Sequence, residues 1–151
     1  DKGEDDHFNY LVRRAGGRLH LTPRVRSTYF SRSTYRALAN QYWGYGKAKG
    51  RAMVDEPGSI RMRHRIPLAV VAIGVGLIAA SPFVRVARVV LTVCFAVYGG
   101  LAAYAARGAT KRREERKLAL RTATVFPVVH VSYAFGVAAG ILGEVVRRLR
   151  R

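Results

Sequence analysis

The chain after residue 58 alternates between long apolar stretches and short, strongly basic ones. Three stretches without a charged side chain cover Ile66 to Val84, Val89 to Ala106 and Thr122 to Gly143. Each approaches or exceeds the roughly 20 residues that an α-helix needs to cross about 30 Å of hydrocarbon. The pattern therefore predicts an α-helical membrane region over residues 59–151, with two to three transmembrane helices near 66–84, 89–106 and 122–143.

Before residue 58 the apolar residues no longer form long stretches but recur at the spacing of short helices and strands. Asp5 or Asp6 can cap a helix whose apolar residues keep helical spacing, and the glycine pair at 16–17 can end that helix in a left-handed turn. Residues 18–30 contain two short stretches of alternating, β-branched or aromatic side chains, which are typical of strands. Together these elements predict the end of an α/β unit.

A second helix is expected over about 33–53, with aromatic side chains along one side. Such side chains suit the interface between lipid headgroups and water, so the pattern predicts an interfacial helix. Its three glycines, Gly44, Gly46 and Gly50, weaken it as a free-standing helix. Residues 55–58 are predicted to form the turn that follows.

The net charge of the chain suits two kinds of partner, and the positions of the basic residues favour one of them. The 27 Lys and Arg against 9 Asp and Glu give a net charge of +18, which suits either nucleic acid or an anionic membrane surface. The basic residues gather beside the apolar stretches, at 61–65, 107–121 and 147–151. Cations beside anionic lipid gain about 1 kcal/mol each. Membrane lipids therefore account for the charge, and no nucleic acid is expected as a partner.

The direction in which the apolar stretches cross the membrane follows from the same cations, with one conflict. If the basic residues at 61–65 are cytoplasmic, two crossings also leave 107–121 inside, in agreement with the positive-inside rule. A full crossing by 122–143 would then place the arginines at 147–151 outside, against the rule. Two interpretations stay open: a full crossing, which we favour, or a re-entrant or interfacial segment.

Few residues could hold a metal or form a covalent link. Cys94 is the single cysteine and lies inside an apolar stretch, so we expect it to contact lipid or to be packed as a small hydrophobic residue. No spacing of His, Cys and carboxylates resembles a metal site, and no Asp-x-Asp motif occurs. We predict no metal and no cofactor for these 151 residues.

Glu4, Asp5 and Asp6 form an acidic cluster in an otherwise basic chain. A carboxylate at a helix N-terminus is stabilised as the anion, by about 0.3 to 1 kcal/mol at an exposed site. The same anion can accept a proton. The cluster therefore has two interpretations, one as a simple helix cap and the other as the source of a general base.

Several motifs between residues 3 and 53 occur in a recognisable order. They are Gly-Glu-Asp-Asp-x-x-Asn-x-x-x-Arg-x-Ala-Gly-Gly, then Pro23, Tyr-Phe-Ser-Arg-Ser at 29–33, and Ala-Leu-x-x-Gln-Tyr-x-x-Tyr-Gly at 37–46. Their order and spacing resemble the carboxyl-terminal part of membrane-anchored family 2 glycosyltransferases, above all those of the succinoglycan-biosynthesis type. The segment His130-x-x-Tyr133-x-x-Gly136 is also similar to that group.

This resemblance implies a fold and an activity. The expected fold is the carboxyl-terminal remnant of an α/β glycosyltransferase A-type domain at 1–58, its acceptor-side end, followed by the membrane helices. The expected activity is inverting sugar transfer from a nucleotide sugar to a polyprenyl-linked acceptor in exopolysaccharide or surface glycan synthesis. The expected location is the bacterial cytoplasmic membrane, with the catalytic part in the cytoplasm.

By the resemblance, Glu4 and Asp5 match the catalytic Glu-Asp pair of the family, and Asp5 is the candidate base. Gln41 matches the start of a Gln-x-x-Arg-Trp motif found in processive synthases. Gly44 and Tyr45 replace its Arg and Trp, which argues against a polymerising enzyme. Tyr45 or Trp43 could offer an aromatic face to the acceptor, or could anchor the helix at the membrane interface.

His130 and Tyr133 are three residues apart, on one side of a helix. An imidazole in an apolar stretch usually bonds a neighbouring helix; the alternative is contact with the phosphate or headgroup of a polyprenyl carrier. The family's nucleotide-binding half has no counterpart in this sequence. We therefore expect a fragment that is inactive alone, and Mg²⁺ or Mn²⁺ in the complete enzyme. A small, non-enzymatic membrane protein that binds anionic lipid or a partner protein is the alternative function.

Overall fold

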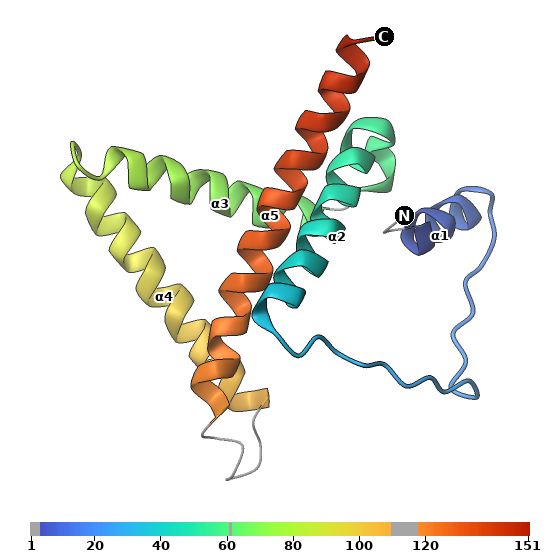
Figure 1. Ribbon diagram of the computed structural model, residues 1–151, viewed down its shortest axis with the longest axis horizontal. Coiled ribbons are helices and arrows are strands. Elements are labelled where there is room, and N and C mark those ends of the chain that lie inside the picture. The colour runs from blue at the N-terminus through green and yellow to red at the C-terminus, as the bar shows by residue number, and fades with distance from the viewer. Residues whose placement is uncertain (1–3, 61, 110–117) are drawn as a thin grey trace.

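The computed structural model describes residues 4–60, 62–109 and 118–151, and these residues are mainly helical (Figure 1). Their elements, in chain order, are α1 (Glu4–Arg14), α2 (Tyr35–Asp55), the 3-10 helix η1 (Pro57–Ser59), α3 (Met62–Ala80), α4 (Arg85–Ala109) and α5 (Ala119–Leu149).

Local sequence explains where α1 and α2 begin and end. The first turn of α1 is acidic and its last turn is basic, which complements the helix dipole. Gly16, with φ of +80°, follows that helix in the left-handed region that glycine adopts most easily. The Oγ1 of Thr34 accepts a hydrogen bond from the Ala37 N–H at 3.2 Å and caps α2. The predicted turn after α2 is confirmed as η1.

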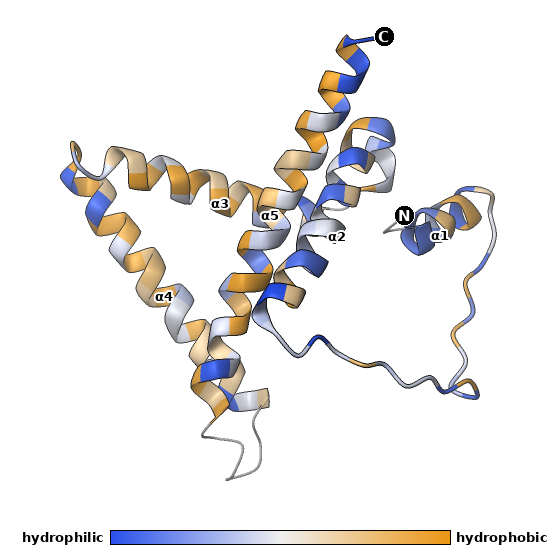
Figure 2. Ribbon diagram, in the orientation of Figure 1, coloured by the Kyte–Doolittle hydropathy of each residue, from blue (hydrophilic) through white to orange (hydrophobic). Residues whose placement is uncertain are grey.

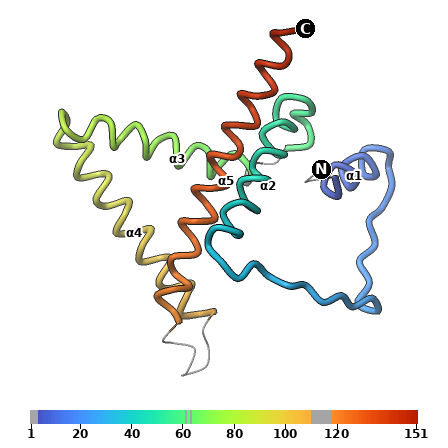
Figure 3. The backbone as a smooth tube through the Cα atoms, viewed as in Figure 1, coloured from blue at the N-terminus to red at the C-terminus, as the bar shows by residue number. Residues whose placement is uncertain are grey.

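The prediction of an α/β remnant at residues 1–58 is wrong, because the described part of this segment contains helices and no strand. Residues 18–30 contain no strand and form an extended, exposed connection between α1 and α2 (Figure 3). Leu21 is 98% exposed and Phe30 is 84% exposed. A strand is stable when a neighbouring strand accepts and donates its backbone hydrogen bonds, and no strand exists in the described part of the chain. Alternation and β-branched content alone could not produce a sheet here.

The apolar stretches all form helices, which are largely hydrophobic along their length (Figure 2). Two of them, α4 and α5, are long and apolar enough to cross a membrane. The helix α3 stops at Ala80, before the predicted end at Val84, because the chain turns there: Ser81 Oγ donates to the Ile78 carbonyl at 2.8 Å. Its apolar part, His64–Ala80, is shorter than the other two.

The most extensive helix contact is between α2 and α5, which run side by side in the same direction (Figures 1 and 3). Near their amino ends, Tyr35 Oη lies 2.6 Å from Thr124 Oγ1. Near their carboxyl ends, Arg148 Nη2 lies 2.8 Å from Asp55 Oδ1. The helices α3 and α4 contact each other and α5, and together with α5 they outline an open triangle (Figure 1).

Four glycines allow α2 and α5 to approach closely. A Cβ built on Gly46 would lie 2.9 Å from Val137 N, and one on Gly50 would lie 2.9 Å from Ile141 N. In the other direction, a Cβ on Gly136 would lie 3.1 Å from Lys47 N, and Gly140 meets α2 backbone in the same way. Each helix thus carries a Gly-x-x-x-Gly pair at the contact, the spacing that lets helix backbones touch in membranes.

Candidate functional site

A cavity of about 760 Å³ lies between the amino end of α1, one side of α2 and the middle of α5. Most of the side chains that line it are acidic, basic or aromatic. They are Glu4, Asp5, Asp6, His7, Tyr45, Ala48, Lys49, Arg51, Ala52, Asp55, Glu56, Ser59, His64 and Tyr133.

Helical periodicity explains the wall that α2 contributes. Tyr45, Lys49, Ala52 and Glu56 follow one another at intervals of three or four residues, so they share one side of the helix. The neighbouring side holds Gly46, which packs on α5. The close helix contact therefore fixes the orientation of the cavity wall.

Two polar contacts bring the acidic end of α1 to this wall. Asp6 Oδ2 lies 2.7 Å from Lys49 Nζ, and His7 Nδ1 lies 3.2 Å from Glu56 Oε2. Asp5, which directly precedes Asp6, lines the cavity together with Tyr45. The structure thus places the candidate base beside the aromatic helix, with its side chain exposed.

The three candidate acceptor-binding residues differ in position. Tyr45 lines the cavity, whereas Gln41 and Trp43 are not part of its lining. Gln41 Nε2 donates to the hydroxyls of Tyr29 and Tyr45, at 3.0 Å each, and so ties the extended connection to α2. Trp43 is 43% exposed. An acceptor-binding role for all three stays a prediction.

His130 and Tyr133 point to different neighbours. His130 Nδ1 lies 2.9 Å from Tyr98 Oη, which links α5 to α4, and the two rings meet edge to face. Tyr133 lines the cavity instead. Contact of His130 with a carrier phosphate stays a prediction.

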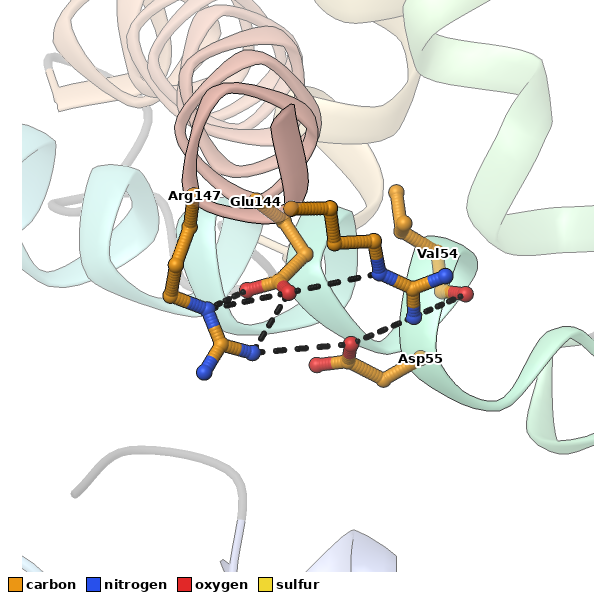
Figure 4. A network of polar contacts seen from close by, with 5 residues as sticks. Val54, Asp55, Glu144 and Arg147 are labelled. Atoms are coloured by element: carbon orange, nitrogen blue, oxygen red, sulfur yellow. Dashed lines mark hydrogen bonds and ion pairs between the residues drawn. The ribbon is translucent and has the colours of Figure 1, made fainter. Parts of the chain in front are cut away.

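A polar network borders the cavity at Asp55 (Figure 4). The Glu144 carboxylate is 4% exposed and accepts two hydrogen bonds from Arg147 Nε, at 2.9 and 3.0 Å. Arg148 Nη2 bonds both Asp55 and the Val54 carbonyl. The hydrogen bond from Arg148 holds the pKa of the Asp55 carboxyl below its usual value of 3.8, although partial burial opposes this shift.

The described residues offer no group of three or more His, Cys, Asp or Glu side chains that could hold a metal ion. A divalent cation therefore does not fit this cavity as it stands, despite its acidic edge. The Mg²⁺ or Mn²⁺ expected with a nucleotide sugar has no set of ligands among these residues.

Sequence reasoning missed the basic side of the cavity, formed by Lys49, Arg51 and His64. The spacing of Lys49 from Tyr45 and of Glu56 from Ala52 could have shown that these residues share a side of α2. No signal in the sequence indicated which α1 carboxylate would meet Lys49, because that contact joins elements separated by a long connection.

Comparison with known proteins gives one partial similarity. No protein-family model matches the chain, and no solved structure matches it. Over 77 residues it is 30% identical to the succinoglycan biosynthesis protein ExoA of Rhizobium meliloti (strain 1021). The match covers 51% of this chain and 23% of that protein. This similarity supports a weak, glycosyltransferase-like relationship and no more specific type.

Proposed function

We propose that this chain is the acceptor-binding, membrane-attached part of an inverting, non-processive glycosyltransferase. Its substrates are a nucleotide sugar and a polyprenyl-linked acceptor, in exopolysaccharide or surface glycan synthesis at the bacterial cytoplasmic membrane. One observation carries the proposal: Asp5, Tyr45 and Tyr133 line the same cavity, and that cavity is built on a helix of membrane-spanning length. The similarity to a succinoglycan biosynthesis protein supports the same class of reaction.

In this proposal Asp5 is the general base. A sugar hydroxyl is a weak nucleophile until a positioned group takes its proton. The Asp5 carboxylate takes the proton of the acceptor hydroxyl while the hydroxyl oxygen forms a bond to the anomeric carbon of the donor. The bond between that carbon and the nucleotide breaks, and the nucleotide leaves with the electron pair. A single displacement inverts the anomeric configuration.

The cavity walls suit a sugar acceptor attached to a lipid. Tyr45 and Tyr133 offer aromatic faces on which an apolar sugar face can pack. Arg51 and His64 lie on the same cavity and can approach an anionic group of the acceptor. In this proposal α5, which contributes Tyr133 to the lining, crosses the bilayer, and a polyprenyl chain reaches the cavity from the lipid.

The test is Asp5→Asn in the complete protein as its gene encodes it. Membranes that contain the variant are supplied with nucleotide sugars and lipid-linked acceptor. We expect transfer to fall by about 10²- to 10⁴-fold, the usual contribution of a general base. Membrane insertion should not change.

His20→Gln is the control variant, because His20 lies in the exposed connection outside the cavity lining. It should retain the wild-type rate. An Asp5→Asn protein that also retains this rate would remove Asp5 as the base.

A further inference from the structure

We propose that Lys49 is a positioning residue that holds the acidic turn of α1 against α2 through Asp6, and thereby places Asp5 at the cavity. The catalytic consequence rests on the proposed function. The docking itself does not, because it is a statement about two helices.

Apolar packing contributes little to the position of α1. None of its residues is buried, and Phe8 and Leu11 stay open to solvent at 64% and 42%. Tyr10 is half-buried, and its hydroxyl lies near Gly58 of η1. Burial of apolar surface is the main force that usually fixes a helix in place. The position of α1 therefore depends largely on its polar contacts.

The contact between Asp6 and Lys49 is the best placed of these. The Lys49 side chain is 18% exposed, whereas that of Asp6 is 58% exposed. A lysine side chain that is largely removed from water gains from an anion that pairs with its ammonium group. Lys49 therefore favours the state in which the α1 carboxylate lies 2.7 Å away. The pair of His7 and Glu56 adds a second contact one residue later.

The two sides of this contact differ in rigidity. Lys49 precedes Gly50, which packs directly on the backbone of Val137 and Ile141 in α5. The cation is thus attached to the closest helix contact in the molecule. The helix α1 has no such backbone contact, so its position depends on what its carboxylates bind. Because Asp5 adjoins Asp6, a release of Asp6 would move the proposed base away from Tyr45.

The first experiment measures docking without any activity. Paired spin labels at Leu11→Cys and Arg36→Cys, in a Cys94→Ser protein, report the distance between α1 and α2. We expect one narrow distance in the parent protein and a broad distribution after Lys49→Ala. Lys49→Arg, which keeps the charge, should restore the narrow distance.

Two further variants separate the specific pair from general damage. The exchange Asp6→Lys with Lys49→Asp reverses the pair and should restore docking that either single variant loses. Lys47→Ala is the matched control, since Lys47 lies two residues earlier on α2 and is exposed. It should leave the distance narrow. A narrow distance in Lys49→Ala, or a charge exchange that fails to restore docking, would overturn the proposal.

The second experiment follows sugar transfer by the complete protein. Lys49→Ala should lower kcat by about a hundredfold, as misplacement of a reacting group does, with a much smaller change in KM for the nucleotide sugar. Lys49→Arg should recover most of the rate. If Asp5→Asn stays active while Lys49→Ala still releases α1, the proposed base is wrong and the docking role stands. If α1 stays docked without Lys49, the positioning role fails whatever the activity.

Discussion

The guanidinium of Arg148 joins the carboxylate of Asp55, with Nη2 at 2.8 Å from Oδ1, and so ties the carboxyl end of α5 to that of α2 (Figure 4). The same nitrogen donates to the Val54 carbonyl at 3.0 Å. This end of the helix pair borders the cavity, because Asp55 belongs to the cavity lining. The link therefore contributes both to the stability of the pair and to the shape of the site.

Arg148→Met should lower the thermal unfolding midpoint of the detergent-solubilised protein, because Asp55 and the Val54 carbonyl lose their donor. Arg150→Met is the control, since Arg150 is exposed and lies just after α5. It should leave the midpoint nearly unchanged. Equal midpoints for the two variants would show that the link does not stabilise the helix pair.

Acid should weaken the same link. The pKa of Asp55 is lower in the folded protein than its usual 3.8, so the folded state binds fewer protons on this carboxyl than the unfolded state. The stabilisation is complete above pH 3.8 and is lost as the pH falls through the lowered pKa. Asp55→Asn should thus be less stable than the wild type at about pH 7, and the difference should shrink as the pH falls below 3.8. A stability difference that stays constant over this range would contradict the assignment.

Two glycines on α5 should respond to alanine in opposite directions. In Gly140→Ala the new Cβ would meet the backbone of Lys47 and Arg51, so we expect a loss of about 1 to 3 kcal/mol. Gly143 has nothing within 4 Å of its Cβ position, so Gly143→Ala should gain up to about 1 kcal/mol from helix propensity. Unfolding of the two variants in detergent measures both. A stable Gly140→Ala protein would argue against the close helix contact.

Cys94 gives a direct test of the membrane position of α4. It is the single cysteine of the sequence and is exposed on a helix long enough to span a bilayer. We expect a charged, membrane-impermeant maleimide to label it slowly in intact membranes and quickly after the membrane proteins are dissolved in denaturant. A lipid-soluble maleimide should label it in both. Rapid labelling of intact membranes by the charged reagent would place α4 in water.

The helices could be predicted because their causes are local. Acidic residues begin α1, Gly16 follows its end, and uncharged stretches form α4 and α5. The second helix, expected from about residue 33, begins slightly later: Thr34 is its cap and Tyr35 its first residue. Local preference cannot choose between neighbouring candidates when the tertiary contacts of the helix decide where it starts.

The arrangement of the helices could not be predicted from local patterns. Gly46 and Gly50 weaken an isolated helix, yet in the structure they are the positions at which α2 meets α5. Residues 18–30 have strand-like composition, but no strand pairs with them in the described part of the chain. In both cases the outcome depends on a partner distant in sequence, and a single sequence does not show which segments meet.

The parallel pairing of α2 with α5 has a consequence for biosynthesis. The ribosome makes Tyr35 to Asp55 well before it makes Ala119 to Leu149, and chains begin to fold from the amino end as they emerge. While α3 and α4 are translated, the glycines of α2 therefore lack the α5 backbone on which they pack in the folded protein. The cavity can form only after α5 has been made, because Tyr133 of α5 is part of its lining. Assembly of the site therefore joins two helices that leave the ribosome at different times.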